Sequence, residues 1–171
     1  MYKIRLATVA DSRQLAQMRW MFTNEHRTHP VSEPLFPAFE AEFGEFWEAA
    51  ARSGHWFVWV AEAADAEDAE DADEAPTAEY GEIIAHIYME LVHKVPRPGR
   101  VTHPFAYMTN VYTKPDYRSR GIGSKLLQAI ESWVKAEQLE FVIVWPSEDG
   151  RDFYLRNGYV PSNEMLEFHP D

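Results

Sequence analysis

The sequence predicts a single domain of the α/β (α+β) class, in which about four helices flank a mixed, mostly antiparallel central sheet. Three runs rich in aromatic and β-branched residues, at 56–61, 81–91 and 105–113, are joined by hairpin-type connections, which predicts an antiparallel meander. A helical pattern and a short apolar run follow the third strand, and this order indicates a parallel crossover. The chain has 171 residues, 46% of them hydrophobic, so we expect one core and one domain over 1–171.

One strand and two helices are predicted before the meander. Apolar and charged residues alternate over residues 2–7, as in a half-buried strand. Helical spacing then extends to about Glu25, and a second helix runs from about Phe36 to Gly54. The apolar face of the second helix is mostly aromatic and comprises Phe36, Phe39, Phe43, Phe46, Trp47 and Ala50. This face either packs in the core or forms the wall of a pocket for an acceptor molecule.

Two helices and two short strands are predicted after the meander. Apolar residues repeat at helical spacing over 121–137, and the apolar run 141–145 follows as a strand. The side chain of Ser147 or Asp149 could cap a short helix beyond it. We expect a last strand over 165–168.

The acidic residues are concentrated in one segment. The formal net charge is -12, but eleven acidic residues and no Lys or Arg lie between residues 53 and 93, which leaves 17 acidic against 16 basic residues elsewhere. Residues 62–79 are mainly Ala, Asp and Glu, so we expect a mobile, solvated loop insertion between two strands. The insertion is either a tolerated surface loop or a device that attracts cationic substrates.

Several classes of function are excluded by what the sequence lacks. No basic face is evident, which argues against a nucleic-acid partner. The chain has no cysteine, so no thiolate zinc site can form, and no metal site is predicted. No apolar run approaches the roughly 20 residues that span a membrane. The first residues also lack the apolar core of a signal peptide. We therefore expect a cytoplasmic protein with no membrane partner.

The most informative stretch runs from the third meander strand into the following helix. Pro115 ends the strand, and Arg118-Ser-Arg-Gly-Ile-Gly123 precedes the helical pattern. The first N–H groups of a helix have no internal partner and favour negative charge, so this turn predicts a phosphate cradle. A dinucleotide-binding fold would need a third glycine where Leu126 stands, and the Gly-Lys-Ser/Thr of a Walker loop is absent.

A second motif follows about thirty residues later, as Phe153-Tyr154-x-x-x-Gly158-Tyr159. Together with Arg118-x-x-Gly121-x-Gly123 between a strand and a helix, it resembles the GNAT superfamily of acetyl-CoA-dependent N-acetyltransferases over essentially the whole chain. The resemblance implies a GNAT-like fold whose strands splay at the cofactor site. It also implies direct transfer of an acetyl group from acetyl-CoA to a primary amine of a small molecule or a protein or peptide. Family members often form homodimers.

The resemblance assigns roles to individual residues. The main-chain amides around Arg118, Ser119, Arg120, Gly121, Ile122, Gly123 and Ser124 would bind the pyrophosphate of coenzyme A. The strand segment Val111, Tyr112 and Thr113 would bind the pantetheine arm, and a main-chain N–H near Val111 would polarise the thioester carbonyl. Tyr154 would protonate the leaving thiolate. Ser147 stands where members often have an Asn that contacts the cofactor.

The residues that handle the acceptor are less well defined. Asn110, at the end of the strand, could position the acceptor amine or a water, or make a structural hydrogen bond. The general base could be Glu82, His86, Glu90, His103 or water. The first three are predicted to share one face of their strand with Ile84 and Tyr88. A different class of function also fits the sequence, namely a non-catalytic acetyl-CoA sensor or interaction module.

Overall fold

The computed structural model describes residues 1–25, 27–63, 81–162 and 166–170, and its centre is a five-stranded sheet. The strands lie in chain order: β1 (Tyr2–Leu6), β2 (Trp56–Ala63), β3 (Ile83–Val92), β4 (Phe105–Thr113) and β5 (Val142–Val144). The first four pair antiparallel, and β5 pairs parallel to β4. The predicted meander and the parallel crossover are therefore both confirmed.

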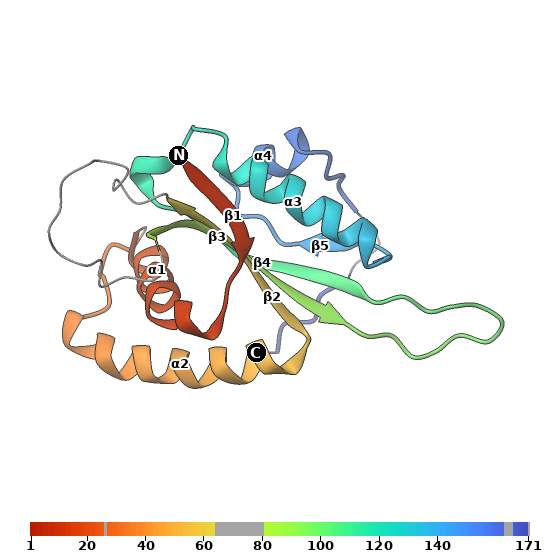
Figure 1. Cartoon of the computed structure of the whole chain (residues 1–171), viewed down its shortest axis with the longest axis horizontal. Coiled ribbons are helices and arrows are strands. Elements are labelled where there is room, and N and C mark those ends of the chain that lie inside the picture. The colour runs from red at the N-terminus through yellow and green to blue at the C-terminus, as the bar shows by residue number, and fades with distance from the viewer. Residues whose placement is uncertain (26, 64–80, 163–165, 171) are drawn as a thin grey trace, which may run out of the picture.

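Four α-helices among the described residues cover the two faces of the sheet (Figure 1). On one face lie α1 (Ser12–Glu25) and α2 (Phe36–Ser53), and on the other lie α3 (Ile122–Ala136) and α4 (Arg151–Arg156). Each face has its own buried cluster: Leu15, Met18, Phe43 and Trp47 pack against Val58, and Leu126 and Ile130 pack against Met89 and Met108. The predicted fold class is confirmed.

Two details of side-chain direction differ from the sequence prediction. Phe46 is 43% exposed, so the buried face of α2 is Phe43, Trp47 and Ala50. Ile84 packs in the α3 cluster, whereas His86 and Tyr88 lie on the α1 face. The pairing of β2 with β3 shifts between Ala61 and Glu62, and this irregularity breaks the alternation on which the prediction depended.

The C-terminal part differs from the prediction in two places. Gly150 is the N-cap of α4, and no side chain of Ser147 or Asp149 caps the helix. Residues 166–168 form no strand; Met165 lies outside the described residues. Of the predicted loop 62–79, residues 62 and 63 belong to β2, and the rest also lies outside the described part.

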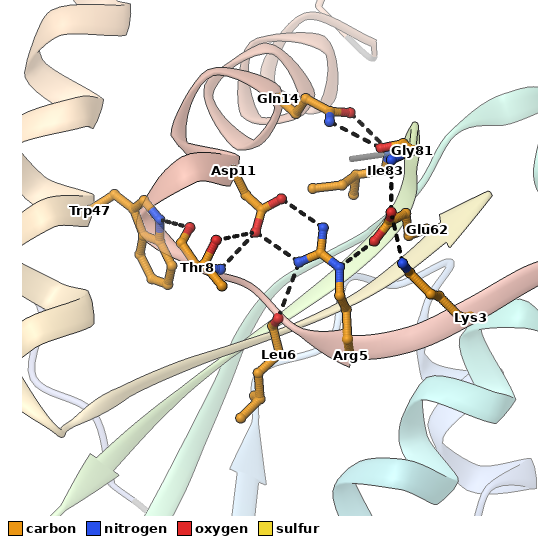
Figure 2. Close-up of polar contacts among 10 residues, drawn as sticks. All are labelled: Lys3, Arg5, Leu6, Thr8, Asp11, Gln14, Trp47, Glu62, Gly81 and Ile83. Carbon is orange, nitrogen blue, oxygen red and sulfur yellow. Dashed lines mark hydrogen bonds and ion pairs between the residues drawn. The ribbon is translucent and has the colours of Figure 1, made fainter. Parts of the chain in front are cut away.

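A buried ionic network joins β1, the start of α1 and the ends of β2 and β3 (Figure 2). Arg5 donates to both carboxylate oxygens of Asp11 at 2.8 Å and forms an ion pair with Glu62. Glu62 also accepts from the N–H of Gly81 at 2.7 Å. Gln14 bonds the carbonyl of Gly81 at 3.2 Å and the N–H of Ile83 at 2.9 Å. The network therefore holds the end of β2 beside the start of β3.

Two classes of feature are missing from the described residues. No helix among them is long and apolar enough to cross a membrane. Within the same ranges, no three His, Asp or Glu side chains come together as a metal site.

Candidate active site

The pairing of β3 with β4 contains an irregularity at Asn110. Tyr88 pairs with Thr109 and His86 pairs with Tyr112, so Asn110 and Val111 together lie opposite Ile87. Asn110 has a φ of 48°, in the left-handed region that few residues other than glycine adopt without strain. These features define a β-bulge in β4.

Hydrogen bonds on either side of the bulge fix the directions of its amide groups. Ala106 donates its N–H away from β3, to Phe141 O at 3.1 Å, whereas Lys114 donates towards β3, to Ile84 O at 2.9 Å. In a regular strand, every second N–H group points to the same side. By this rule Ala106 predicts that the N–H of residue 110 points away from β3, whereas Lys114 predicts that it points towards β3. We infer that the extra residue of the bulge accounts for this difference, and that Asn110 and Val111 both direct their N–H groups away from β3.

The strand on that side of the bulge is short. β5 pairs with β4 only from Ala106 to Met108 and ends at Val144. Within the described ranges, no strand pairs with β4 on this side beyond Met108. The amides of Asn110 and Val111 therefore face the region where the two strands part, as the predicted splay requires.

Two side chains hold Asn110 from the α1 face. Arg19 of α1 donates to the side-chain carbonyl of Asn110 at 3.0 Å. The Nδ1 of His86 lies 2.8 Å from the main-chain oxygen of Asn110, and because a carbonyl only accepts, Nδ1 carries the proton. His86 is fully buried, and this burial lowers its pKa to about 4. Its Nε2 and the hydroxyl of Tyr88 have no hydrogen-bond partner among the described residues.

The turn before α3 has the form of the predicted cradle. Gly121 is the N-cap with a φ of 76°, and the N–H of Lys125 bonds to its carbonyl at 3.1 Å. The amides of Ile122, Gly123 and Ser124 precede this bond, so they have no carbonyl one turn earlier to bond to. Ser119 adopts a φ of 59°, and residues 119–121 are exposed. The turn therefore has several adjacent main-chain N–H groups that no helix carbonyl accepts.

The two arginines of the motif point in different directions. Arg118 forms two hydrogen bonds with the carboxylate of Glu25, at 2.5 and 2.6 Å, and a third with Thr113 O at 2.9 Å. Its own N–H is bonded to Pro115 O at 3.1 Å. Arg120 is exposed and lies 5.5 Å from the ring centre of Tyr117. Arg118 thus ties the turn to the end of α1, while Arg120 extends into solvent.

The two sequence motifs meet in space. A Cβ atom at Gly123 would lie 3.1 Å from the ring of Phe153, so glycine at this position leaves room for the ring against α3. Tyr154 follows Phe153 and lines a hollow of about 390 Å³ beside β5. It is 8% exposed, and burial raises its pKa to about 12.

The other predicted residues lie farther from the bulge. Ser147 is exposed and accepts a hydrogen bond from the N–H of Gly150 at 3.2 Å. Glu82 is held by Lys114 Nζ at 2.6 Å and by the hydroxyl of Tyr117 at 3.1 Å, and the hydrogen bond from Lys114 lowers its pKa. Glu90 pairs with Tyr107, on the far side of the bulge. His103 precedes β4.

Sequence analysis overlooked Arg19 and Glu25, which connect α1 to β4 and to the cradle. Arg19 had a detectable signal. It lies four residues after Leu15 and three before Phe22, so it falls on the apolar face of the helix. A charged residue on a buried face needs a partner, which Asn110 supplies. No comparable pattern marks Glu25.

Comparisons with known proteins identify a matching family and similar folds. The model of the Acetyltransferase (GNAT) family matches residues 15–159. A predicted acetyltransferase from Clostridium acetobutylicum, solved with acetyl-CoA, superposes with a TM-score of 0.73 at 21% identity, over 99% of this chain and 96% of that one. An aminoglycoside acetyltransferase from an uncultured soil metagenomic sample, solved with sisomicin, gives a TM-score of 0.66 at 15% identity, over 99% and 95% of the two chains.

One curated relative shares a short stretch of sequence. It is an aminoglycoside N(6')-acetyltransferase type 1 from Acinetobacter genomosp. 13, and it is 43% identical over 37 residues. The matched stretch spans 22% of this chain and 25% of that enzyme.

Proposed function

The chain belongs to the GNAT acetyltransferase family, and from this premise we propose that it transfers an acetyl group from acetyl-CoA directly to a primary amine. The observation that carries the proposal is the bulge of β4 at Asn110 and Val111, next to the short strand β5. We infer from it that the two main-chain N–H groups open towards the gap between β4 and β5. In the proposed reaction, the amine nitrogen forms a bond to the acetyl carbon and the carbon–sulfur bond breaks.

The residues at the turn before α3 fit the pyrophosphate of coenzyme A. Free amides at a helix start bind phosphate oxygens, and the helix dipole adds to the attraction. We assign this role to the main chain of Ser119, Arg120, Gly121, Ile122, Gly123 and Ser124. Arg118 supports the turn through Glu25 instead of offering its own charge. Val111, Tyr112 and Thr113 would bind the pantetheine arm through their main-chain groups.

The bulge would stabilise the charge that develops on the thioester oxygen. Fixed N–H groups aimed at a developing oxyanion often provide the largest single contribution to acyl transfer. Asn110 and Val111 supply two such groups from adjacent residues. Tyr154 would then donate its proton to the departing thiolate. Because its pKa is raised to about 12, its hydroxyl stays protonated across the physiological range.

The proton of the acceptor amine would pass to water. His86 is a weak base, because burial lowers its pKa to about 4. Glu82 is weakened as a base by its bond from Lys114. Glu90 pairs with Tyr107, three residues before Asn110, which places it about 10 Å away at roughly 3.3 Å per residue. His103 precedes β4 and therefore lies farther from Asn110 along the chain than Tyr107 does.

The acceptor that we propose is a small molecule with several amino groups. The formal net charge of -12 would attract such a polycation. The local likeness to an aminoglycoside N(6')-acetyltransferase supports the same class. A protein amine is the alternative that an acceptor screen would test beside it.

An acceptor screen with thiol detection tests the proposed function. Purified protein is incubated with acetyl-CoA and a panel of aminoglycosides, polyamines, amino acids and lysine-containing peptides, and free coenzyme A is measured. We expect turnover that depends on the amine, with the acetyl group found on nitrogen by mass spectrometry. Calorimetric binding of acetyl-CoA without turnover on any amine would instead indicate the sensor function.

A further inference from the structure

His86 is buried in a way that needs a physical explanation. It is 0% exposed, and its Nε2 has no hydrogen-bond partner among the described residues. An unpaired buried nitrogen loses its hydrogen bonds to water without replacement, so a position that needed only packing would favour an apolar side chain. Its other nitrogen, Nδ1, makes one contact, with the main-chain oxygen of Asn110 at 2.8 Å. This contact is therefore the feature that distinguishes histidine here from an apolar residue.

Asn110 needs external support in its observed conformation. Its φ of 48° lies in the left-handed region, where a residue with a side chain is strained. Such a conformation persists only where the surroundings fix it. His86 bonds the main-chain carbonyl, and Arg19 bonds the side-chain carbonyl at 3.0 Å. The two bonds come from different elements, β3 and α1, so they fix both the backbone and the side chain of the residue.

We propose that His86 and Arg19 are positioning residues that hold the Asn110 bulge and thereby aim the main-chain N–H groups of Asn110 and Val111 at the thioester oxygen. The inference rests on the proposed acetyl transfer. The peptide group that contains the carbonyl of Asn110 also contains the N–H of Val111. Fixing that carbonyl towards His86 therefore directs this N–H to the opposite side, towards the gap between β4 and β5.

The surroundings of His86 suit a positioning role. Tyr88, Tyr112 and Arg19 are the ionisable groups that face it, from β3, β4 and α1 respectively. The proximity of Arg19 and the burial of the ring both disfavour imidazolium, and burial lowers the pKa of His86 to about 4. The ring therefore keeps a single charge state throughout the neutral range, with Nδ1 as a donor. A support of this kind does not change with the proton transfers of the reaction.

A pair of substitutions at His86 separates positioning from proton transfer. An Asn side chain can place an N–H near the position of Nδ1, whereas a Gln side chain extends to the position of Nε2; neither is a base. We expect His86→Gln to lower kcat about 100-fold, as small misplacements of reacting groups do, with little change in KM for acetyl-CoA. We expect His86→Asn to stay within about 5-fold of the wild type, because the donor is restored.

Isotope-edited infrared spectroscopy reports directly on the aimed amides. The carbonyl stretch of bound acetyl-CoA, labelled with ¹³C, should lie below its solution frequency in the wild type and in His86→Asn. In His86→Gln it should return towards the solution value. Arg19→Gln, which removes the contact from α1, should give an intermediate shift. Thermal unfolding of each variant establishes that it is folded.

Three results would overturn the inference. Equal loss of kcat in folded His86→Asn and His86→Gln would make His86 a base. Unchanged kcat and carbonyl frequency in His86→Gln would show that the bulge needs no support. If neither His86 variant folds, a carbonyl frequency in folded Arg19→Gln that equals the wild-type value also rejects the proposal. A wild type that binds no acetyl-CoA and acetylates no amine would instead reject the proposed function itself.

Discussion

Gly81 occupies a position where no other residue fits. A Cβ atom there would lie 2.3 Å from the main-chain oxygen of Ala63, and that oxygen belongs to the sheet and cannot move aside cheaply. We predict that Gly81→Ala lowers the free energy of unfolding by about 2–3 kcal/mol, as strain in a packed core does. Gly44→Ala is the matched control. It lies inside α2 with 3.7 Å of clearance to Ser12 Oγ, so it should raise stability by about 0.5–1 kcal/mol.

Urea denaturation of both variants checks this prediction. Equal effects of the two substitutions would mean that the close approach at Gly81 relaxes without cost.

Tyr154 has a role that can be separated from its packing. Tyr154→Phe removes only the hydroxyl, so the ring contacts with Phe153 and Tyr159 are retained. We predict a fall in kcat of roughly 10²- to 10⁴-fold, the usual contribution of a general acid, with KM for acetyl-CoA nearly unchanged. Burial raises the pKa of Tyr154 to about 12, so the acid is protonated below that pH and lost above it. The wild-type kcat should therefore show no loss from this group up to pH 10.

Steady-state kinetics between pH 6 and 10 measure both quantities. Tyr159→Phe is the control, because this neighbouring tyrosine has its pKa raised by burial to a similar value and has no assigned role. Similar kcat values for Tyr154→Phe and the wild type would remove the acid role.

Helix α1 connects two parts of the candidate site. Arg19 reaches the bulge in β4, and Glu25 at the end of the helix pairs with Arg118 beside the cradle. We predict that Glu25→Gln raises KM for acetyl-CoA about 5-fold and leaves kcat near the wild-type value, because a partly exposed ion pair contributes up to about 1 kcal/mol. Glu48→Gln, which removes an exposed pair with Arg52 on α2, should change neither parameter. Equal KM values for all three proteins would contradict a supporting role for Glu25.

The ionic network between β1, α1 and the sheet makes stability depend on pH. Burial alone would raise the pKa of Asp11, but hydrogen bonds from Arg5 and Thr8 outweigh burial and lower it below 3.8. Glu62 behaves in the same way through Arg5 and Gly81, so its pKa falls below 4.5. A carboxylate with a depressed pKa stabilises the fold above its unfolded pKa and loses this contribution as pH falls. We predict a steep loss of stability below about pH 4.5. In this range the two carboxylates bind protons in the unfolded chain at a higher pH than in the folded protein.

Denaturation at several pH values, with Asp11→Asn for comparison, tests the network. The variant should be about 3 kcal/mol less stable at pH 7, because it leaves Arg5 with one buried partner fewer. It should also lose less stability on acidification. A parallel pH dependence in the two proteins would assign the acid sensitivity to other groups.

The architecture of the whole molecule was largely predictable from the sequence. The order of strands and helices followed from hydrophobic spacing and from breakers such as Pro115 and Gly54, which act locally. The bounds of β4 agree with the prediction at both ends. The glycine turn before α3 was also predicted from local rules, because a helix start is defined by consecutive residues.

Features that depend on pairing between distant strands escaped prediction. The bulge at Asn110 arises from a shift in register against β3, and no local pattern marks it. The shift at Ala61 and Glu62 likewise misplaced Ile84. The strand predicted at 165–168 is absent over its described residues, 166–168. The roles assigned to Tyr154 and to the cradle residues stay predictions until the kinetics above are measured.

The contact between Glu62 and Gly81 also affects how the fold tolerates changes in the number of residues between them. These residues are 19 apart in sequence and are joined at 2.7 Å, and Ala63 bonds Glu82 O at 2.8 Å. Closing a loop between two such residues costs entropy that rises slowly with the number of residues between them, by about 0.6 kcal/mol per doubling. Replacing residues 64–80 with four Gly and Ser residues should raise stability by about 1 kcal/mol, measurable by urea denaturation. The same corner of the sheet should accept grafted peptides of widely different length.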